Sequence, residues 1–336
     1  MVKVLVTGGA GFIGSNFVRH ALAAHEDWQV TTLDKLTYAG RLENLASVEH
    51  HPRHRFVKGD VADAGVAAPL VKESDIVVHF AAETHVDRSI TNAGEFITTD
   101  VYGTFVLLEA ARENPALRRF VQISTDEVYG SVAEGASRET DELKPRNPYS
   151  ASKAGADRLA YSYWATYKVP VIITRASNNY GPNQFPEKII PLFITNLFDD
   201  IPVPLYGDGQ NERDWLHVDD HCRGVDVLID KGVSGELYNI GGGNQVKNVD
   251  LTHRILALVG KPASLIRPVA DRPGHDRRYS LDTAKLEALG WRPQETFDEG
   301  LARTVAWYRQ NERWWRPIKD EDPEFRKYYQ HQYGNR

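Results

Sequence analysis

The residues best suited to chemistry are two adjacent carboxylates, Asp126 and Glu127, followed by Tyr149 and Lys153. Tyr149 and Lys153 are four residues apart, so on a helix their side chains share one face. An ammonium group beside a phenol favours the phenolate and lowers the pKa of the phenol. The pair is therefore typical of a base that removes the proton of a sugar or alcohol hydroxyl at neutral pH.

The two carboxyl groups could divide the roles of acid and base between them. Two like charges in a partly buried site have separated pKa values, so one group stays protonated while the other is ionised. The plainer interpretation is that an Asp-Glu pair is a solvated loop, and that a tyrosine and a lysine four residues apart occur by chance. The neighbouring elements favour chemistry over this interpretation.

Those elements place all four side chains at one edge of a sheet. Arg118–Ile123 is rich in buried-strand residues, so the acid pair lies just past the carboxyl end of a strand, where open parallel sheets bind ligands. Asn147 is a good helix N-cap and Pro148 a good first helical residue. Tyr149 is therefore predicted in the first turn of the next helix.

A glycine-rich turn near the N-terminus predicts a dinucleotide site. The strand Val2–Thr7 leads into glycines 8, 11 and 14, which open a helix. Such glycines allow a tight turn and a close approach of the backbone to a pyrophosphate at the helix N-terminus. The spacing differs from Gly-x-Gly-x-x-Gly, but the strand–turn–helix context is the one that the motif requires.

The choice of cofactor depends on Asp34, which ends the predicted strand Gln29–Leu33. A carboxylate there binds the ribose hydroxyls and repels a 2′-phosphate, which favours NAD over NADP. Lys35 and Arg41 lie nearby and weaken that preference. Asp60, at the end of a third strand, is equally compatible with an adenine contact and with a helix N-cap.

Strands and helices alternate through the first half of the chain. This predicts an α/β fold, a Rossmann-like doubly wound parallel sheet with a smaller, mixed α/β C-terminal substrate domain. The expected parts are an NAD-binding domain with the catalytic residues (1–175), a mainly sugar-nucleotide-binding region with segments returning to the sheet (176–320), and a tail (321–336). Helices are expected at 94–113, 148–167, 186–197, 217–229, 250–259, 282–289 and 298–308. The tail could pack as a flap or fray.

Composition excludes several classes of protein. The chain has 336 residues and a net charge of −6, which gives no reason to expect nucleic acid or an anionic membrane as a partner. Cys222 is the only cysteine and is expected to be buried and unbridged. No segment resembles a signal peptide or a membrane span, and no histidine pattern predicts a metal site, so a cytoplasmic, metal-free protein is expected.

Four arginines are predicted in loops among glycine and proline turns. Guanidinium groups bind phosphates bidentately, so these side chains could clamp a diphosphate. The alternative is that they are solvated. They are Arg213, Arg272, Arg277 and Arg278.

These motifs together resemble the extended short-chain dehydrogenase/reductase family, in its sugar-nucleotide dehydratase branch. The resemblance covers nearly the whole chain, and the discriminating piece is Ser124–Gly130 with its Asp-Glu pair. Related epimerases and decarboxylases lack this pair. The other matching segments are Thr7–Gly14, Asp34–Gly40, Ala81–Ser89, Pro186–Pro191 and Arg272–Tyr279.

The resemblance implies an activity and a partner. The expected substrate is dTDP-glucose, converted through C4 oxidation, loss of water across C5 and C6, and hydride return to C6. The product would be a 4-keto-6-deoxy sugar for deoxysugar biosynthesis. NAD would stay tightly bound and be recycled. The resemblance also implies a homodimer that pairs the helices at 94–113 and 148–167. Neither the nucleobase preference nor the downstream pathway follows from the residues themselves.

The resemblance also implies roles for individual residues. The catalytic set is Thr125, Asp126, Glu127, Tyr149 and Lys153. The cofactor-binding set is Gly8, Gly11, Phe12, Ile13, Gly14, Asp34, Lys35, Leu36, Thr37, Gly40, Asp60, Val61, Ala81, Ala82, Thr99, Tyr149, Lys153 and Asn179. The substrate-binding set is Thr84, His85, Thr125, Asp126, Glu127, Asn178, Glu187, Lys188, Ile189, Pro204, Tyr206, Arg213, Asn248, Arg272, His275 and Tyr279.

Three other functions are compatible with parts of the pattern. A UDP-sugar 4-epimerase or a UDP-glucose 4,6-dehydratase of the same fold would share the cofactor motifs. An epimerase, however, needs no acid or base at C5 and C6, so Asp126 and Glu127 would be unexplained. A non-catalytic NAD-sensing protein would leave Tyr149 and Lys153 unexplained as well.

Overall fold

The computed structural model describes residues 1–271 and 274–334, and its centre is a parallel sheet. Seven strands are ordered β10-β6-β5-β4-β1-β2-β3, and each pair of neighbours is parallel. The predicted Rossmann-like doubly wound fold is confirmed. The strands are β1 (Val2–Thr7), β2 (Trp28–Asp34), β3 (His54–Lys58), β4 (Ile76–His79), β5 (Arg119–Thr125), β6 (Val171–Ala176) and β10 (Leu237–Ile240).

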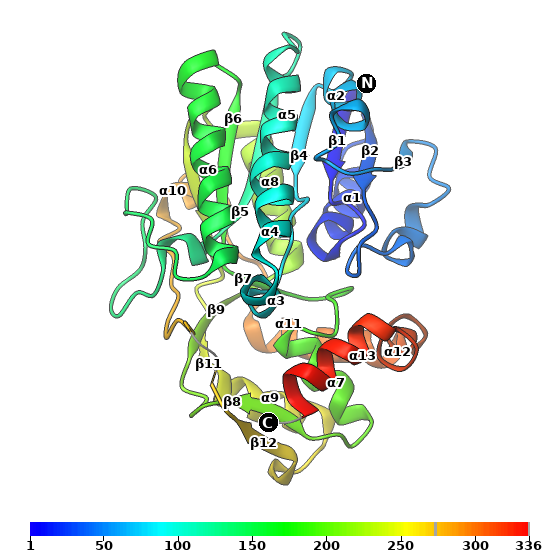
Figure 1. Cartoon of the computed structure of the whole chain (residues 1–336), viewed down its shortest axis with the longest axis vertical. Helices are drawn as coiled ribbons and strands as arrows, with labels where there is room; N and C mark the ends of the chain where they lie inside the picture. The colour runs from blue at the N-terminus through cyan, green and yellow to red at the C-terminus, as the bar shows by residue number, and fades with distance from the viewer. Residues whose placement is uncertain (272–273, 335–336) are drawn as a thin grey trace.

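Helices cover both faces of the sheet because successive residues of a strand point to opposite faces. Val4 and Val6 of β1 pack in one core with α1 (Phe12–Ala24) and α8 (Val218–Lys231). Leu5 packs in a second core on the opposite face, with helices α2 (Ala64–Lys72), α5 (Gly103–Arg112) and α6 (Pro148–Tyr167). Figure 1 shows α5 and α6 side by side in front of the sheet, with α8 behind.

The register brings the carboxyl ends of the strands to one edge. Thr7 is paired with His79 and with Leu33, and Thr125 is paired with Ala176. The turns that follow β1, β2, β4, β5 and β6 therefore all open at the same edge. This is the edge at which the sequence places the acid pair and the glycine-rich turn.

A second, smaller part of the molecule lies below this edge in Figure 1. It holds a three-stranded sheet of β7 (Asn178–Tyr180), β9 (Glu212–His217) and β11 (Gln245–Lys247), and a parallel pair of β8 (Val203–Tyr206) and β12 (Ile266–Val269). The helices α7 (Ile189–Phe198), α9 (Asn248–Val259) and α11 (Phe297–Gln310) share an apolar core with these strands.

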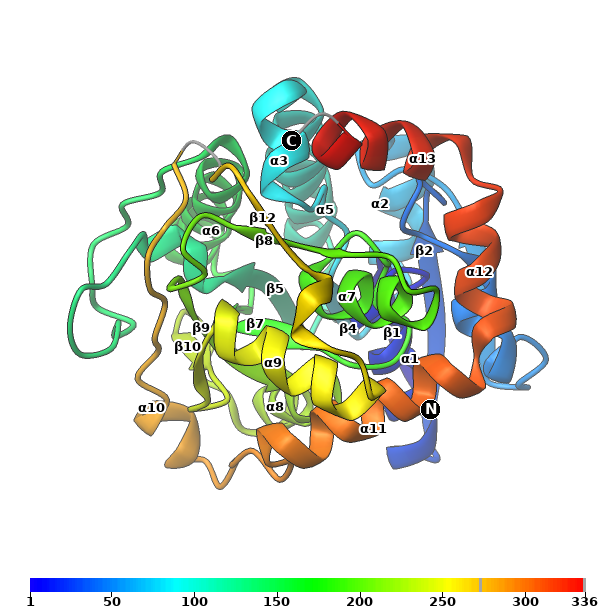
Figure 2. The same ribbon diagram turned by 90° about the horizontal axis from the view of Figure 1, so that it is seen from below.

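The tail is packed rather than frayed as far as Gly334. It follows α12 (Glu312–Asp320) and forms α13 (Pro323–Tyr329) and a π-helical turn, η5 (Gln330–Gly334). In Figures 1 and 2 these red segments run past α7 towards α3 (Val86–Thr91). The C-terminal segment thus returns from the smaller part to the edge of the main sheet.

Several expected helices differ in their bounds. The helix expected at 94–113 is interrupted by a π-helical turn, and it runs as α4 (Ala93–Phe96), η2 (Ile97–Tyr102) and α5. Phe105, on α5, is 38% exposed and lies on the outer face of that helix. The helix expected at 282–289 is only α10 (Ala284–Glu287). The remaining elements are η1 (Leu42–Val48), η3 (Asp126–Tyr129) and η4 (Ala263–Leu265).

Two further sequence expectations can be compared with the described residues. Cys222 is a free, buried thiol, as predicted. None of the helices in the described ranges combines the length and apolar character that crossing a bilayer requires.

Candidate active site

The acid pair lies at the carboxyl end of β5. Thr125 is the last residue of the strand, and its hydroxyl accepts a hydrogen bond from the backbone N–H of Glu127 at 3.3 Å. This cap starts the short 3₁₀ turn that carries Asp126 and Glu127. The turn projects both carboxyl groups at the edge of the sheet, as the sequence indicated.

Tyr149 and Lys153 face this turn from the start of α6. The helix begins as predicted, with Asn147 as N-cap, Pro148 in the first turn, and a reciprocal capping box between Asn147 and Ser150. The Lys153 ammonium is buried and donates to the carbonyl of Ile123, in β5, at 2.8 Å. That bond ties the helix directly to the catalytic strand.

The pKa of Tyr149 is shifted in the direction opposite to the one predicted. Burial, followed by the charges of Glu127 and Asp100, raises the pKa of the Tyr149 phenol well above its ordinary value. The sequence argument counted the ammonium of Lys153 but neither the desolvation nor the two carboxylates. In the protein alone, Tyr149 is therefore a phenol, and further positive charge is needed to make it a base.

The surroundings of Asp126 favour its protonated form. It is only 3% exposed, and burial, then the charges of Glu127 and Asp214, raises the pKa of its carboxyl well above the usual range. Its Oδ1 accepts from the Thr125 hydroxyl at 3.1 Å, and none of the described residues hydrogen-bonds its buried Oδ2. This carboxyl can therefore donate a proton to a ligand group in the site.

Glu127 is positioned by long contacts from two directions. Its Oε2 lies 3.5 Å from Asn147 Nδ2 and 3.5 Å from the Tyr279 hydroxyl. Tyr279 also donates to Asp276 at 2.7 Å, and the guanidinium of Arg213 lies 4.4 Å from the centre of its ring. Residues of the smaller part of the molecule thus complete the surroundings of the acid pair.

A single large cavity of about 410 Å³ joins these groups to the glycine-rich turn. All the predicted cofactor-binding residues line it except Leu36. A Cβ on Gly14 would lie 2.2 Å from the Gly8 carbonyl oxygen, so the turn admits no side chain there. Gly8, Gly11 and Gly14 also line the cavity at the start of α1, so the residues present fit a dinucleotide.

Asp34 organises the end of the cavity at which the sequence predicts the adenosine of the cofactor. Its carboxylate accepts from the backbone N–H groups of Ala10 at 2.9 Å and Leu36 at 2.8 Å, which fixes it beside the glycine-rich turn. Lys35 is paired with Asp60 at 2.7 Å. Asp60 accepts from Ala62 and does not cap α2, whose N-cap is Asp63, so the N-cap alternative for Asp60 is wrong.

The predicted substrate residues line the remainder of the cavity, with two exceptions. Tyr279 does not line it and reaches it only through its contact with Glu127, and Arg272 lies outside the described residues. Glu187 is buried and accepts from Tyr38 at 2.9 Å and from Arg88 at 3.0 Å. Lys188 lies 3.2 Å from the Thr84 hydroxyl. The β4 and α7 sides of the cavity are joined by these bonds.

Two of the four arginines that could clamp a diphosphate, Arg277 and Arg278, form ion pairs away from the cavity. Arg277 pairs with Asp208 at 2.9 Å and Arg278 with Glu212 at 2.8 Å, and neither lines the cavity. Both are surface ion pairs that join the segment after β12 to the smaller sheet. Arg213 does line the cavity, from strand β9 rather than from a loop.

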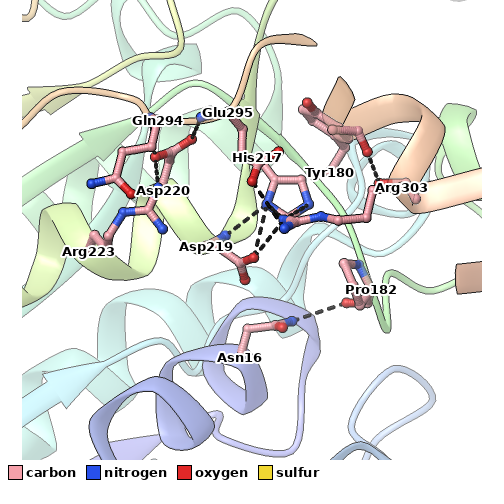
Figure 3. Close-up of polar contacts among 12 residues, drawn as sticks. Asn16, Tyr180, Pro182, His217, Asp219, Asp220, Arg223, Gln294, Glu295 and Arg303 are labelled. Atoms are coloured by element: carbon pink, nitrogen blue, oxygen red, sulfur yellow. Dashed lines mark hydrogen bonds and ion pairs between the residues drawn. The ribbon is translucent and has the colours of Figure 1, made fainter. Parts of the chain in front are cut away.

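Asn178 and Asn179 lie on strand β7, and the turn that follows this strand is braced from both sides (Figure 3). Asn16 of α1 donates to the carbonyl of Pro182 at 3.0 Å. On the other side, His217 caps α8 by accepting from the N–H of Asp219 at 3.2 Å, while Arg303 of α11 binds the Asp219 carboxylate at 2.7 Å. The brace links α1, β9, α8 and α11 around this turn.

Some residues of the cavity were not predicted. His221, on α8, lies 2.9 Å from Asn179 Oδ1, and burial lowers the pKa of its imidazole to about 4, so it is neutral at ordinary pH. Tyr38 and Tyr333 also line the wall. Tyr38 lies in the matching segment Asp34–Gly40 but was given no role, and the segment around Tyr333 carries no motif. Their three-dimensional contacts reveal that both belong to the cavity wall.

Comparison with known proteins identifies a family. The family model described as GDP-mannose 4,6 dehydratase matches residues 5–304. A protein of Streptomyces antibioticus described as dTDP-glucose 4,6-dehydratase is 55% identical over 324 residues, which are 95% of this chain and 96% of that protein.

Solved structures give the same result. The dTDP-glucose 4,6-dehydratase of Streptomyces venezuelae, crystallised with NAD and TYD, is 54% identical and superposes with a TM-score of 0.92 over 95% of this chain and 100% of that chain. A UDP-glucose 4-epimerase of Thermus thermophilus, in complex with NAD, is 31% identical, with a TM-score of 0.84 over 92% of this chain and 99% of that chain. The dehydratase is thus the more similar of the two.

Proposed function

The chain belongs to the family described as GDP-mannose 4,6 dehydratase, and on that premise we propose how its cavity works. The protein is an NAD-dependent hydro-lyase that converts dTDP-glucose to dTDP-4-keto-6-deoxy-glucose. The observation that most strongly supports this function is the Asp126-Glu127 pair, which follows β5 and lines the same cavity as Tyr149. A 4-epimerase has no step that uses both carboxyl groups.

The first step is oxidation at C4. Tyr149 takes the proton of the 4-hydroxyl, and Thr125 hydrogen-bonds the same oxygen. Bound NAD supplies the hydride acceptor for C4 and the hydride donor for C6, and its oxidised ring is positively charged. Lys153, held by its bond to Ile123, adds a second positive charge that opposes the upward shift of the Tyr149 pKa.

The second step is the loss of water across C5 and C6. The 4-ketone acidifies the C5 hydrogen, which Glu127 removes as base. Asp126, kept protonated by its burial, gives its proton to the departing 6-hydroxyl. Glu127 then gives its proton back to C5 as C6 receives the hydride that bound cofactor would supply, so that atoms and electrons balance.

Mass spectrometry of the purified protein with dTDP-glucose, without added NAD, tests this function. We expect the sugar nucleotide to lose the mass of one water with no net formation of NADH, because the cofactor is reduced and reoxidised in each turnover. UDP-glucose in a parallel reaction measures the nucleobase preference. An isomer of unchanged mass would favour the epimerase instead.

A pH profile tests the role of Asp126. Its pKa is raised, which favours the protonated carboxyl, so turnover should fall as the pH rises through that raised pKa. Asn is nearly the same size but has no acidic proton. We expect Asp126→Asn to lower kcat about 10²-fold and to remove the alkaline decline. A variant that keeps the wild-type alkaline limb would exclude Asp126 as the acid.

We further propose that the protein is a homodimer. Large apolar side chains are exposed on the neighbouring helices η2, α5 and α6 (Figure 1). They are Ile97 (54% exposed), Tyr102 (50%), Phe105 (38%) and Tyr167 (48%). A second copy that covers them would bury a face that water otherwise contacts. Sedimentation equilibrium should give twice the chain mass of 37.8 kDa, and a monomer mass would contradict the proposal.

We also propose that the protein works in the cytoplasm. The proposal follows from its need for NAD and a nucleotide-activated sugar, both of which are cytoplasmic metabolites. Fractionation of cells, with the dehydration of dTDP-glucose as the assay, tests it. Activity confined to a membrane or extracellular fraction would contradict it.

A further inference from the structure

The C-terminal segment, residues 323–334, is anchored to the protein before it reaches the cavity. Phe325 of α13 is 3% exposed and packs with Phe185 and Ile318, and its ring centre lies 6.0 Å from that of Phe185. Tyr38, in the loop after β2, packs against the same cluster. The segment therefore has a fixed position beside the loop that carries cofactor-site residues.

Tyr328 then joins the segment to the loop that follows β4. Its hydroxyl lies 3.2 Å from His85 Nε2. The guanidinium of Arg88 lies 3.7 Å from the centre of the Tyr38 ring and 4.9 Å from that of Tyr328, so that both rings contact it. Arg88 also binds Glu187. A residue of the tail thus takes part in the network that holds a predicted substrate-binding carboxylate.

Gln332 continues the connection to the smaller part of the molecule. It is buried, although it is polar. Its Nε2 donates to Asp87 Oδ2 at 3.2 Å and to the Tyr206 hydroxyl. Asp87 belongs to α3, beside the main sheet, and Tyr206 ends β8. One side chain of the tail therefore bridges the two sides of the cavity.

Tyr333 itself is part of the cavity wall. It is 7% exposed, and its ring centre lies 6.2 Å from that of Tyr206, which in turn lies 6.1 Å from that of His275. All three side chains line the cavity on the side of the smaller sheet pair. Tyr149 lines it on the side of the main sheet, where the sugar reacts.

We infer that Tyr333, together with Tyr206, binds the nucleoside end of the sugar nucleotide, so that the substrate site includes the C-terminal segment. The inference rests on the proposed function. If the C4 atom of the sugar lies at Tyr149, the diphosphate and the nucleoside must extend towards the opposite side of the cavity. A planar pyrimidine base stacks on aromatic rings, and the tail supplies one of the rings found there.

Tyr333→Ala and Tyr333→Phe test the inference with dTDP as the probe. The stacking of one base on one aromatic ring changes affinity by about tenfold or more. We expect Tyr333→Ala to raise the dissociation constant of dTDP, measured by calorimetry, and the KM for dTDP-glucose by about tenfold. The kcat and the amount of co-purified NAD should change by less than about twofold, because the reacting atoms are not touched. Tyr333→Phe keeps the ring and should raise the dissociation constant of dTDP much less than Tyr333→Ala does.

Gln332→Ala is the second variant, for the case that Tyr333→Ala does not fold. It removes the bonds to Asp87 and Tyr206 and should raise the same two constants, by about threefold. Inhibition by inorganic pyrophosphate should be unchanged in both variants, since it lacks a nucleoside. Unchanged dTDP affinity, or an equal loss of pyrophosphate inhibition, would overturn the inference. A wild type that binds dTDP without dehydrating dTDP-glucose would refute only the proposed function.

Discussion

Replacing Glu127 by Gln is expected to stop the exchange of the C5 hydrogen with solvent while leaving the binding of dTDP-glucose and NAD intact. Gln keeps the size of the side chain and can keep the contacts with Asn147 and Tyr279, both at 3.5 Å. It cannot accept the C5 proton, so turnover should fall about 10³-fold or more. Mass spectrometry after incubation in heavy water measures deuterium in the recovered sugar nucleotide.

The same variant should still oxidise C4, because Tyr149 rather than Glu127 takes the 4-hydroxyl proton. Enzyme-bound reduced cofactor would then accumulate and be seen by its near-ultraviolet absorbance. Glu134→Gln is the matched control, since Glu134 is an exposed carboxylate in the segment that follows the same turn. It should leave exchange and turnover unchanged. Deuterium incorporation at the wild-type rate in Glu127→Gln would show that another group is the base.

The sheet and the start of the catalytic helix could be predicted because their signals are local. Each central strand is a short apolar run, and the strand Val2–Thr7 ends at a glycine turn. The dipeptide Asn147-Pro148 placed Tyr149 in the first turn of α6, and the capping box with Ser150 shows why that start is fixed. Interactions of the backbone and the side chains within a few residues of each other determine these features.

The remaining features depend on partners that are distant in the sequence. Gln332 and Asp87 are 245 residues apart, and Arg277 and Asp208 are 69 apart. No spacing rule predicts such contacts, which explains why the sequence left the packing of the tail open and why it grouped Arg277 and Arg278 with arginines that could clamp a diphosphate. The wrong direction predicted for the Tyr149 pKa has the same origin. The prediction used only Lys153, four residues away, whereas burial and charges that the fold brings close raise the pKa.

Tyr149→Phe is expected to abolish C4 oxidation, and with it every later step. Phe keeps the ring, whose centre lies 6.2 Å from that of Phe96, but it has no hydroxyl to take the 4-hydroxyl proton. We expect the rate of cofactor reduction in a single turnover to fall about 10³-fold, with the dissociation constant of dTDP unchanged. Unlike Glu127→Gln, this variant should accumulate no reduced cofactor.

A control substitution at a second tyrosine distinguishes the loss of the catalytic base from the loss of any buried hydroxyl group. Tyr129 is buried, does not line the cavity, and donates to Asn239 at 2.8 Å. Tyr129→Phe should cost about 1 kcal/mol of folding stability and leave cofactor reduction within about threefold of the wild type. If Tyr149→Phe reduced the cofactor as fast as Tyr129→Phe, Tyr149 would not be the base. If only Tyr149→Phe loses cofactor reduction, Tyr149 is the base. Because the pKa of its phenol is raised in the protein alone, positive charge from Lys153 and from the bound cofactor must then lower that pKa.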